Sequence, residues 1–222
     1  MAYSVASKLK EITAKLNLPF IFKASFDKAN RSSVKSYRGP GLDIGMKNFS
    51  EIKKTLDIPI ITDIHEINQV EKVSEVVDII QIPAFLCRQT DLIKAACETK
   101  IPLNIKKGQF LSPGQMINII EKCHSFGNEN IMLCERGSSF GYNNLIVDFL
   151  GVSDLKNFNK PVILDVTHSL QLPGGQGNAA DGRSNQAVDL ALAGTAIGLS
   201  LIHISEPTRL LSISYAVFCV KK

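Results

Sequence analysis

Short apolar runs alternate with amphipathic stretches along most of the chain. The apolar runs are nearly continuous, which predicts strands that are buried on both faces. We predict six strands, within residues 18–26, 58–65, 78–84, 101–107, 129–137 and 160–168. Apolar positions at helical spacing predict helices within residues 5–16, 43–56, 66–77, 89–100, 112–127 and 186–198. In the first helix the expected apolar face consists of Val5, Leu9, Ile12 and Leu16. The alternation of strands and helices indicates an α/β fold with a parallel sheet.

Polar side chains stand where each predicted strand ends. In chain order they are Lys23, Asp63 with His65, Gln81, Lys106, Glu135 with Arg136, and Asp165 with His168. A (β/α)8 barrel, or TIM barrel, gathers residues at the carboxyl ends of its strands around one rim. A doubly wound sheet binds ligands only at its switch point, and the chain has neither a G-x-G-x-x-G nor a P-loop motif. We therefore predict a (β/α)8 TIM barrel.

The predicted barrel is incomplete. The chain opens on a helix, so strand one is absent, and strand eight should follow residues 191–198, where the sequence changes character. We assign residues 1–198 to the barrel domain and residues 199–222 to a non-native tail. This tail, "LSLIHISEPTRLLSISYAVFCVKK", has no clear helix or strand period and resembles a translated sequencing-library adapter. Two open sheet edges are expected, and with them an inactive polypeptide that is prone to aggregation.

The composition narrows the classes of function. The net charge is +4, and the aromatic residues (7%) are not interleaved with the basic ones, so we expect no nucleic acid partner. The five cysteines form no C-x-x-C pair, which is typical of reduced thiols in a cytosolic protein. No apolar run reaches the roughly 18 residues of a spanning helix, and the start lacks a signal peptide. We expect a cytoplasmic protein with no membrane partner.

The stretch "FKASFDKANRSSVKSYRGPG", residues 22–41, is the most basic of the chain. It holds five basic residues against one acid, with Asn30, Ser32 and Ser33 among them. Arginine forks, lysine ammonium groups and neutral donors together suit a phosphate or carboxylate. A solvated basic loop is the alternative.

Further cations follow other predicted strands. Alternation along a strand allows only one of Lys106 and Lys107 to point into the barrel mouth. Taken alone, these lysines could be a solvated edge, Arg136 could pair with Glu135, and His168 could be hydrogen-bonded structure. Together, however, four or five cations on one rim are costly unless a multiply charged anion neutralises them. Two phosphorylated substrates would do so.

Several of these motifs resemble one family. The stretches are "FKASFDKANRSS", "SYRGPGL", "TDIHE", "IQIPAFLCRQTDL", "NIKKGQF", "ERGSSFGYNNLIVD" and "DVTHSLQLPGG". They are similar to the 3-deoxy-8-phosphooctulonate synthases (KDO 8-phosphate synthases), over nearly all of residues 4–198. The resemblance implies a transferase that condenses phosphoenolpyruvate with arabinose 5-phosphate and water, for lipopolysaccharide core biosynthesis. DAHP synthases share the barrel and phosphoenolpyruvate but differ at "KANRSS". A non-catalytic phosphate-binding barrel is a further alternative.

The resemblance also implies roles for individual residues. Lys28, Lys106 and Arg136 would hold the phosphate and carboxylate of phosphoenolpyruvate, supported by Lys23 and Gln81. The sugar phosphate would bind at Asn30, Arg31 and Ser32, and the sugar hydroxyls at Asp63. His168 would lie beside the reacting carbons and the attacking water. We therefore expect Lys106, His168 and Lys28 to be catalytic, and Gln171 to belong to the substrate-binding set.

The resemblance also bears on metal binding and on assembly. Some members of the family bind a divalent metal through a Cys, a His, a Glu and an Asp, whereas others need no metal. Here His168 is the only visible counterpart of the four ligands, and one His cannot make a metal site. The resemblance implies a homotetramer in which Arg31 reaches across a subunit boundary.

Overall fold

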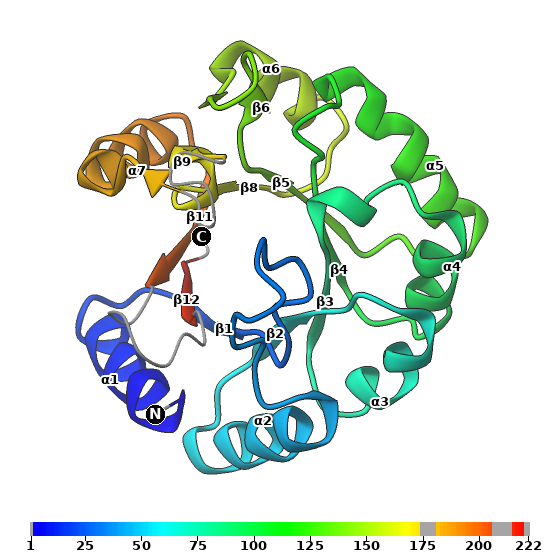
Figure 1. Cartoon of the computed structure of the whole chain (residues 1–222), viewed down its shortest axis with the longest axis vertical. Coiled ribbons are helices and arrows are strands. Elements are labelled where there is room, and N and C mark those ends of the chain that lie inside the picture. The colour runs from blue at the N-terminus through cyan, green and yellow to red at the C-terminus, as the bar shows by residue number, and fades with distance from the viewer. Residues whose placement is uncertain (1, 174–180, 206–214, 220–222) are drawn as a thin grey trace.

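The computed structural model describes residues 2–173, 181–205 and 215–219. Its main strands form a closed barrel, and helices form a ring around it (Figure 1). In order around the barrel, the strands are β1 (Phe20–Ala24), β2 (Ile60–Asp63), β3 (Ile79–Ile82), β4 (Leu103–Lys106), β5 (Ile131–Glu135), β8 (Val162–Asp165), β11 (Ser200–Ser205) and β12 (Tyr215–Cys219). All six predicted strands are therefore confirmed, and so is the α/β barrel class.

Six of the seven α-helices in the described residues fall where the pattern predicts them, and the one at residues 149–156 was not predicted. The α-helices are α1 (Ala2–Lys15), α2 (Leu42–Leu56), α3 (Val70–Ser74), α4 (Thr90–Glu98), α5 (Met116–Ser125), α6 (Phe149–Lys156) and α7 (Ala187–Ala196). Single 3-10 turns occur at η1 (Ile67–Gln69), η2 (Ala84–Leu86), η3 (Pro113–Gln115), η4 (His168–Leu170) and η5 (Ser184–Gln186). Two short hairpins were not predicted, β6 (Ser138–Ser139) with β7 (Leu145–Ile146), and β9 (Gln171–Leu172) with β10 (Asp181–Gly182). No helix among the described residues is both long and apolar enough to cross a membrane.

The alternation of side chains along the strands builds two apolar layers. Outward-facing residues such as Ile80, Ile105 and Leu164 are buried in the large core that lies between the strands and the helices. Inside the barrel, a small cluster joins Cys134, Ile163 and Ile202. Because strand side chains repeat every second residue, the residue two positions later points the same way. The polar residues at the strand ends therefore form the next layer inside the barrel.

The apolar face of α1 agrees with the prediction only in part. Ala6 and Thr13 are buried on this helix, whereas Ile12 is 44% exposed and Leu16 62% exposed. The Thr13 hydroxyl is satisfied locally, since it donates to the backbone oxygen of Leu9 at 2.9 Å. The small Ala6 side chain lets the helix approach the core closely. Val5 and Leu9 of the expected face do pack against the core, so the prediction is confirmed for the first half of the helix and wrong for Ile12 and Leu16.

The expectation of two open sheet edges is wrong for the described structure. β11 pairs in parallel with β8, so that Ser200 aligns with Ile163 and Ile202 with Asp165. β12 then fills the remaining gap and pairs antiparallel with both β11 and β1. The barrel therefore has seven parallel strands and one antiparallel strand, so it falls one parallel strand short of a (β/α)8 barrel. Residues 206–214 and 220–222, which we assigned to the tail, lie outside the described residues.

Candidate active site

Three ionisable side chains meet at the carboxyl ends of β4 and β8. The fully buried carboxylate of Asp165 accepts a hydrogen bond from Lys106 Nζ through Oδ2. The same oxygen lies 2.8 Å from His168 Nδ1, and Lys106 Nζ lies 3.4 Å from that ring nitrogen. The other oxygen, Oδ1, accepts the backbone N–H groups of Thr167 at 3.1 Å and His168 at 2.9 Å. Asp165 thus fixes the turn that carries His168 as well as the two side chains.

The protonation states of this cluster follow from its burial. Burial raises the pKa of Asp165, but His168 and Lys106 outweigh it and hold the pKa well below the usual range. Burial also lowers the pKa of His168 to about 4, although Asp165 opposes this shift. At neutral pH His168 is therefore uncharged. Because the Asp165 carboxylate accepts at Nδ1, the ring proton lies there, which leaves Nε2 as the basic nitrogen.

A second cluster lies at the ends of β1 and β2. Lys23 Nζ donates to Ser25 Oγ at 2.7 Å and lies 3.4 Å from Asp63 Oδ1. Lys28 Nζ donates to the same Ser25 hydroxyl at 3.2 Å. On the other side of Asp63, His65 Nε2 lies 3.3 Å from Oδ2. Burial raises the pKa of Asp63, but Lys23, His65 and Lys28 outweigh it and keep the carboxyl ionised.

Gln81 and Arg136 complete the inner layer. Asn104 Nδ2 donates to Gln81 Oε1 at 3.3 Å in the interior below the rim, and both side chains are buried. Arg136 is almost fully buried, and its Nη2 donates to Gln171 Oε1 at 3.3 Å. Burial lowers the pKa of Arg136, and the carboxylates of Asp165 and Glu135 counteract this effect. The predicted neighbours Arg136 and Gln171 are therefore brought together.

The lysine pair separates as strand alternation requires. Lys106 points into the barrel toward Asp165, whereas Lys107 is fully buried on the other side, 3.4 Å from Glu135 Oε2. Lys107 is thus neither a site cation nor part of a solvated edge.

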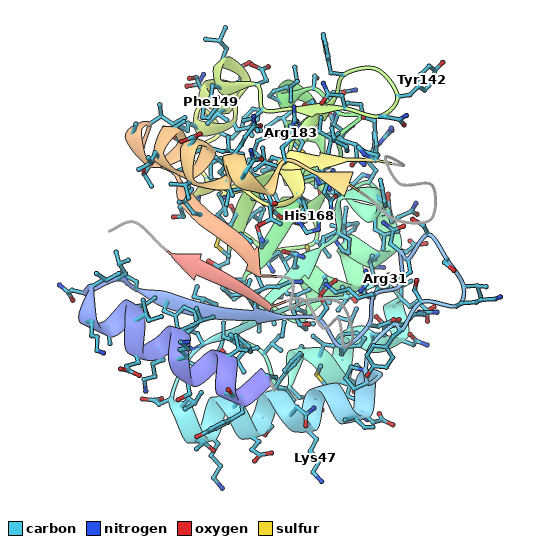
Figure 2. The ribbon with its side chains drawn as sticks, turned by 60° about the vertical axis from the view of Figure 1, so that its left-hand side comes forward. Arg31, Lys47, Tyr142, Phe149, His168 and Arg183 are labelled. Carbon is cyan, nitrogen blue, oxygen red and sulfur yellow. The ribbon has the colours of Figure 1, made fainter. Side chains whose placement is uncertain are left out.

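The loop after β1 holds the remaining predicted residues. Asn30 and Ser32 are exposed and Arg31 is partly buried. A bidentate ion pair shapes this loop, in which Arg38 Nε donates to Asp27 Oδ1 at 2.9 Å and Arg38 Nη2 donates to Oδ2. Figure 2 shows His168 near the centre of the molecule and Arg31 at one side, on the loop. The structure therefore provides an inner cluster and, apart from it, an outer basic loop.

Three residues of the two clusters were given no role from the sequence. Asp165 stands between Lys106 and His168, Ser25 between Lys23 and Lys28, and His65 beside Asp63. Asp165 could have been chosen from sequence, because it ends a predicted strand three residues before His168. Ser25 carries no such signal.

A divalent metal does not fit the residues at hand. Nowhere in the described part of the chain do three His, Cys, Asp or Glu side chains converge as metal ligands would.

Comparison with known proteins gives one family model and several relatives that share one name. A sequence model described as the DAHP synthetase I family matches residues 1–206. A 2-dehydro-3-deoxyphosphooctonate aldolase of Hahella chejuensis is 58% identical over 200 residues, which is 90% of this chain and 71% of that protein. Proteins of the same name from Pseudoalteromonas translucida and Psychromonas ingrahamii are each 58% identical, over 92% and 93% of this chain and 72% and 73% of their own lengths.

Proposed function

Because the chain belongs to the DAHP synthetase I family and matches 2-dehydro-3-deoxyphosphooctonate aldolases at 58% identity, we propose that it acts in the same reaction. The substrates would be phosphoenolpyruvate, arabinose 5-phosphate and water, and the products 2-dehydro-3-deoxyphosphooctonate, which keeps the phosphate of the sugar, and inorganic phosphate. The observation that carries the proposal is the inner cluster itself. Lys23 on β1, Lys106 on β4 and Arg136 directly after β5 are three buried cations at one end of the barrel.

Buried cations favour a small, multiply charged anion. Asp63 and Asp165 balance part of their charge, and the excess would be neutralised by the phosphate and carboxylate of phosphoenolpyruvate. Lys28, at the mouth, would add a further contact, with Gln81 in support. Such a preorganised set would also stabilise charge that develops during the reaction. Holding both substrates removes much of the entropic cost of their encounter.

Each step of the proposed reaction can be assigned to particular residues. C3 of phosphoenolpyruvate would attack the sugar aldehyde, while water adds at C2. Phosphate then leaves by cleavage of the C2–O bond, so that the atoms balance. The uncharged His168, with Nε2 basic and its ring held by Asp165, is suited to orient that water and to accept its proton. Lys106, Lys28 and His168 are accordingly the proposed catalytic residues.

The sugar phosphate would bind toward the outer loop. Asn30, Arg31 and Ser32 offer donors there, and the ionised Asp63 would accept hydrogen bonds from sugar hydroxyls. Both substrates are phosphorylated metabolites, which supports a cytoplasmic role in supplying lipopolysaccharide precursors.

We also propose that the chain assembles with copies of itself. A groove of about 570 Å³ lies between the loop after β4 and the segment from β7 to α6. Phe110 and Leu150 line this groove and are exposed, and Phe140 and Tyr142 are exposed between β6 and β7. Tyr142 extends from the top of the molecule in Figure 2. Exposed apolar groups gathered at one place are typical of contacts between subunits, and a homotetramer is the form that we propose.

The experiment is a phosphate-release assay with purified protein. Phosphoenolpyruvate would be supplied with arabinose 5-phosphate, and separately with erythrose 4-phosphate. The 222-residue chain would be compared with a variant whose residues 199–222 are replaced by the matching segment of the Hahella chejuensis relative. We expect release that depends on arabinose 5-phosphate in the variant, and none or little in the parent.

The other outcomes are equally informative. Release by the parent at the rate of the variant would show that residues 199–222 do not limit turnover. Release only with erythrose 4-phosphate would move the chain to the DAHP synthases. If phosphoenolpyruvate binds both proteins but neither turns over, the alternative of a non-catalytic phosphate-binding barrel is correct.

A further inference from the structure

Lys107 is a fully buried ammonium group outside the inner cluster. Its side chain is 0% exposed, and Nζ donates to Ser138 Oγ at 3.0 Å and to the backbone oxygen of Leu111 at 3.3 Å. The third neighbour is Glu135 Oε2 at 3.4 Å. An ammonium group has three donors, so these contacts use its full capacity. A charge satisfied in this way is held in one place.

Glu135 is the buried partner of Lys107, and it also shapes the chain that follows. The residue is 1% exposed, and its Oε1 accepts the backbone N–H of Gly137 at 2.6 Å. Gly137 has a φ of 90°, and a Cβ there would lie 3.2 Å from Leu145 Cβ and 3.3 Å from Ser169 Cα. The turn after Arg136 is therefore fixed by the carboxylate on one side and by close packing on the other.

Each member of this pair is next in sequence to a cation of the proposed site. Lys107 follows Lys106, and Glu135 precedes Arg136. Backbone hydrogen bonds also join the segments that follow β4 and β5. Lys107 N donates to the oxygen of Cys134 at 2.8 Å, and Ser139 N donates to the oxygen of Gln109 at 2.9 Å. Lys106 and Arg136 repel one another, whereas Lys107 and Glu135 attract one another just outside the barrel wall. The attraction can hold the two like charges at a fixed spacing.

We propose that Lys107 and Glu135 form a positioning pair that sets the spacing of Lys106 and Arg136 for the anion of phosphoenolpyruvate. The inference rests on the proposed function. Neither residue touches the substrate, and the pair acts only through its neighbours. A buried ion pair is weak as a source of stability, because desolvation offsets the attraction, so a purpose other than stability is reasonable.

The test is a calorimetric titration of phosphoenolpyruvate into the 222-residue chain and its variants. The variants are Lys107→Met, Glu135→Gln and the double change, with Lys47→Met on the exposed face of α2 as the matched control. In Figure 2 Lys47 lies at the bottom of the molecule, remote from His168. Arabinose 5-phosphate is titrated as a second ligand, because its proposed contacts do not involve Lys106 or Arg136.

We expect the Kd of phosphoenolpyruvate to rise on the order of tenfold in Lys107→Met, because a misplaced charge loses a matched contact. Glu135→Gln should weaken binding in the same direction. The double variant should bind no more weakly than Lys107→Met, since the two residues act as one unit. The Kd of arabinose 5-phosphate and the behaviour of Lys47→Met should stay within about twofold of the parent.

A purely structural role would lower the unfolding temperature and leave the phosphoenolpyruvate Kd of the folded protein unchanged. That result in any folded variant overturns the inference. If Lys107→Met does not fold, Glu135→Gln and the double variant decide in the same way. If the unmodified chain does not bind phosphoenolpyruvate, the proposed function fails first, and the positioning pair fails with it.

Discussion

The lowered pKa of His168 makes the stability of the protein depend on pH. Its pKa is lowered to about 4, mainly by burial, whereas an unfolded histidine titrates near 6.5. Between these values the unfolded chain binds a proton that the folded chain does not bind. Stability therefore rises with pH across this window, and falls as pH drops from 6.5 toward 4.

We predict that at pH 5 this histidine alone lowers the free energy of unfolding by about 2 kcal/mol relative to pH 7. Denaturant unfolding between pH 4.5 and pH 7 measures the slope. His168→Gln should flatten it, whereas the control His124→Gln, at an exposed ion pair with Glu129 on the surface, should not. An unchanged slope in His168→Gln would contradict the buried environment of the ring. The aspartates with lowered pKa act below pH 3.8, outside this window.

Of the individual site residues, the sequence predicts only some. Polar residues at strand ends identified Lys23, Asp63, Lys106 and Arg136, because the carboxyl ends of parallel strands share one rim. The partners of those residues were harder to find. Ser25 became part of the site because two lysine side chains fold back onto its hydroxyl, a tertiary contact that has no counterpart in local spacing.

At the scale of elements, α1 shows where a periodic pattern misleads. Val5 and Leu9 of the predicted face pack against the core, but at the second half of the helix Thr13 is buried and the larger Ile12 and Leu16 are exposed. Small residues can bury a helix more closely than large ones, because they allow neighbouring elements to approach. Hydrophobic size alone therefore did not decide which face packs, although it did predict that the helix exists.

We predict that Ala6→Leu destabilises the protein by about 1–3 kcal/mol, because the added atoms overpack a fully buried position. For a chain of this size that corresponds to a fall in Tm of roughly 2–12 °C. Ile12→Ala on the exposed face should change stability by no more than about 0.5 kcal/mol. Thermal unfolding monitored by circular dichroism compares the two. A larger loss in Ile12→Ala than in Ala6→Leu would restore the face suggested by the sequence.

The two short hairpins were not predicted from the sequence, for a different reason. β6 with β7 and β9 with β10 each contain two-residue strands, too short for any alternation to be read. Both follow strands whose ends carry site residues, Arg136 and His168. Their geometry is set by tertiary contacts such as the bond from Arg183 Nη2 to the backbone oxygen of Leu145, at 2.6 Å. Such contacts lie beyond what a local pattern can predict.

For the whole molecule, closure of the barrel is the main difference from the prediction. Backbone hydrogen bonding does not depend on side-chain identity, so a gap between two strands can accept a segment in either direction. β12 enters the gap antiparallel, and its partners run from Phe20↔Cys219 to Ala24↔Tyr215 on one side. On the other side they run from Leu201↔Cys219 to Ser205↔Tyr215. A tail of non-native origin, as we propose for residues 199–222, can therefore still close the barrel.

This arrangement predicts the effect of removing residues 206–222. Without β12, β1 and β11 each lose a paired neighbour, and two rows of backbone donors and acceptors become available to other chains. We expect a lower Tm and the appearance of large species in size-exclusion chromatography with light scattering at micromolar concentration. Removal of residues 220–222 alone serves as the control, because it leaves both ladders of β12 intact. An unchanged Tm and a monodisperse truncated chain would show that β12 does not hold the barrel closed in solution.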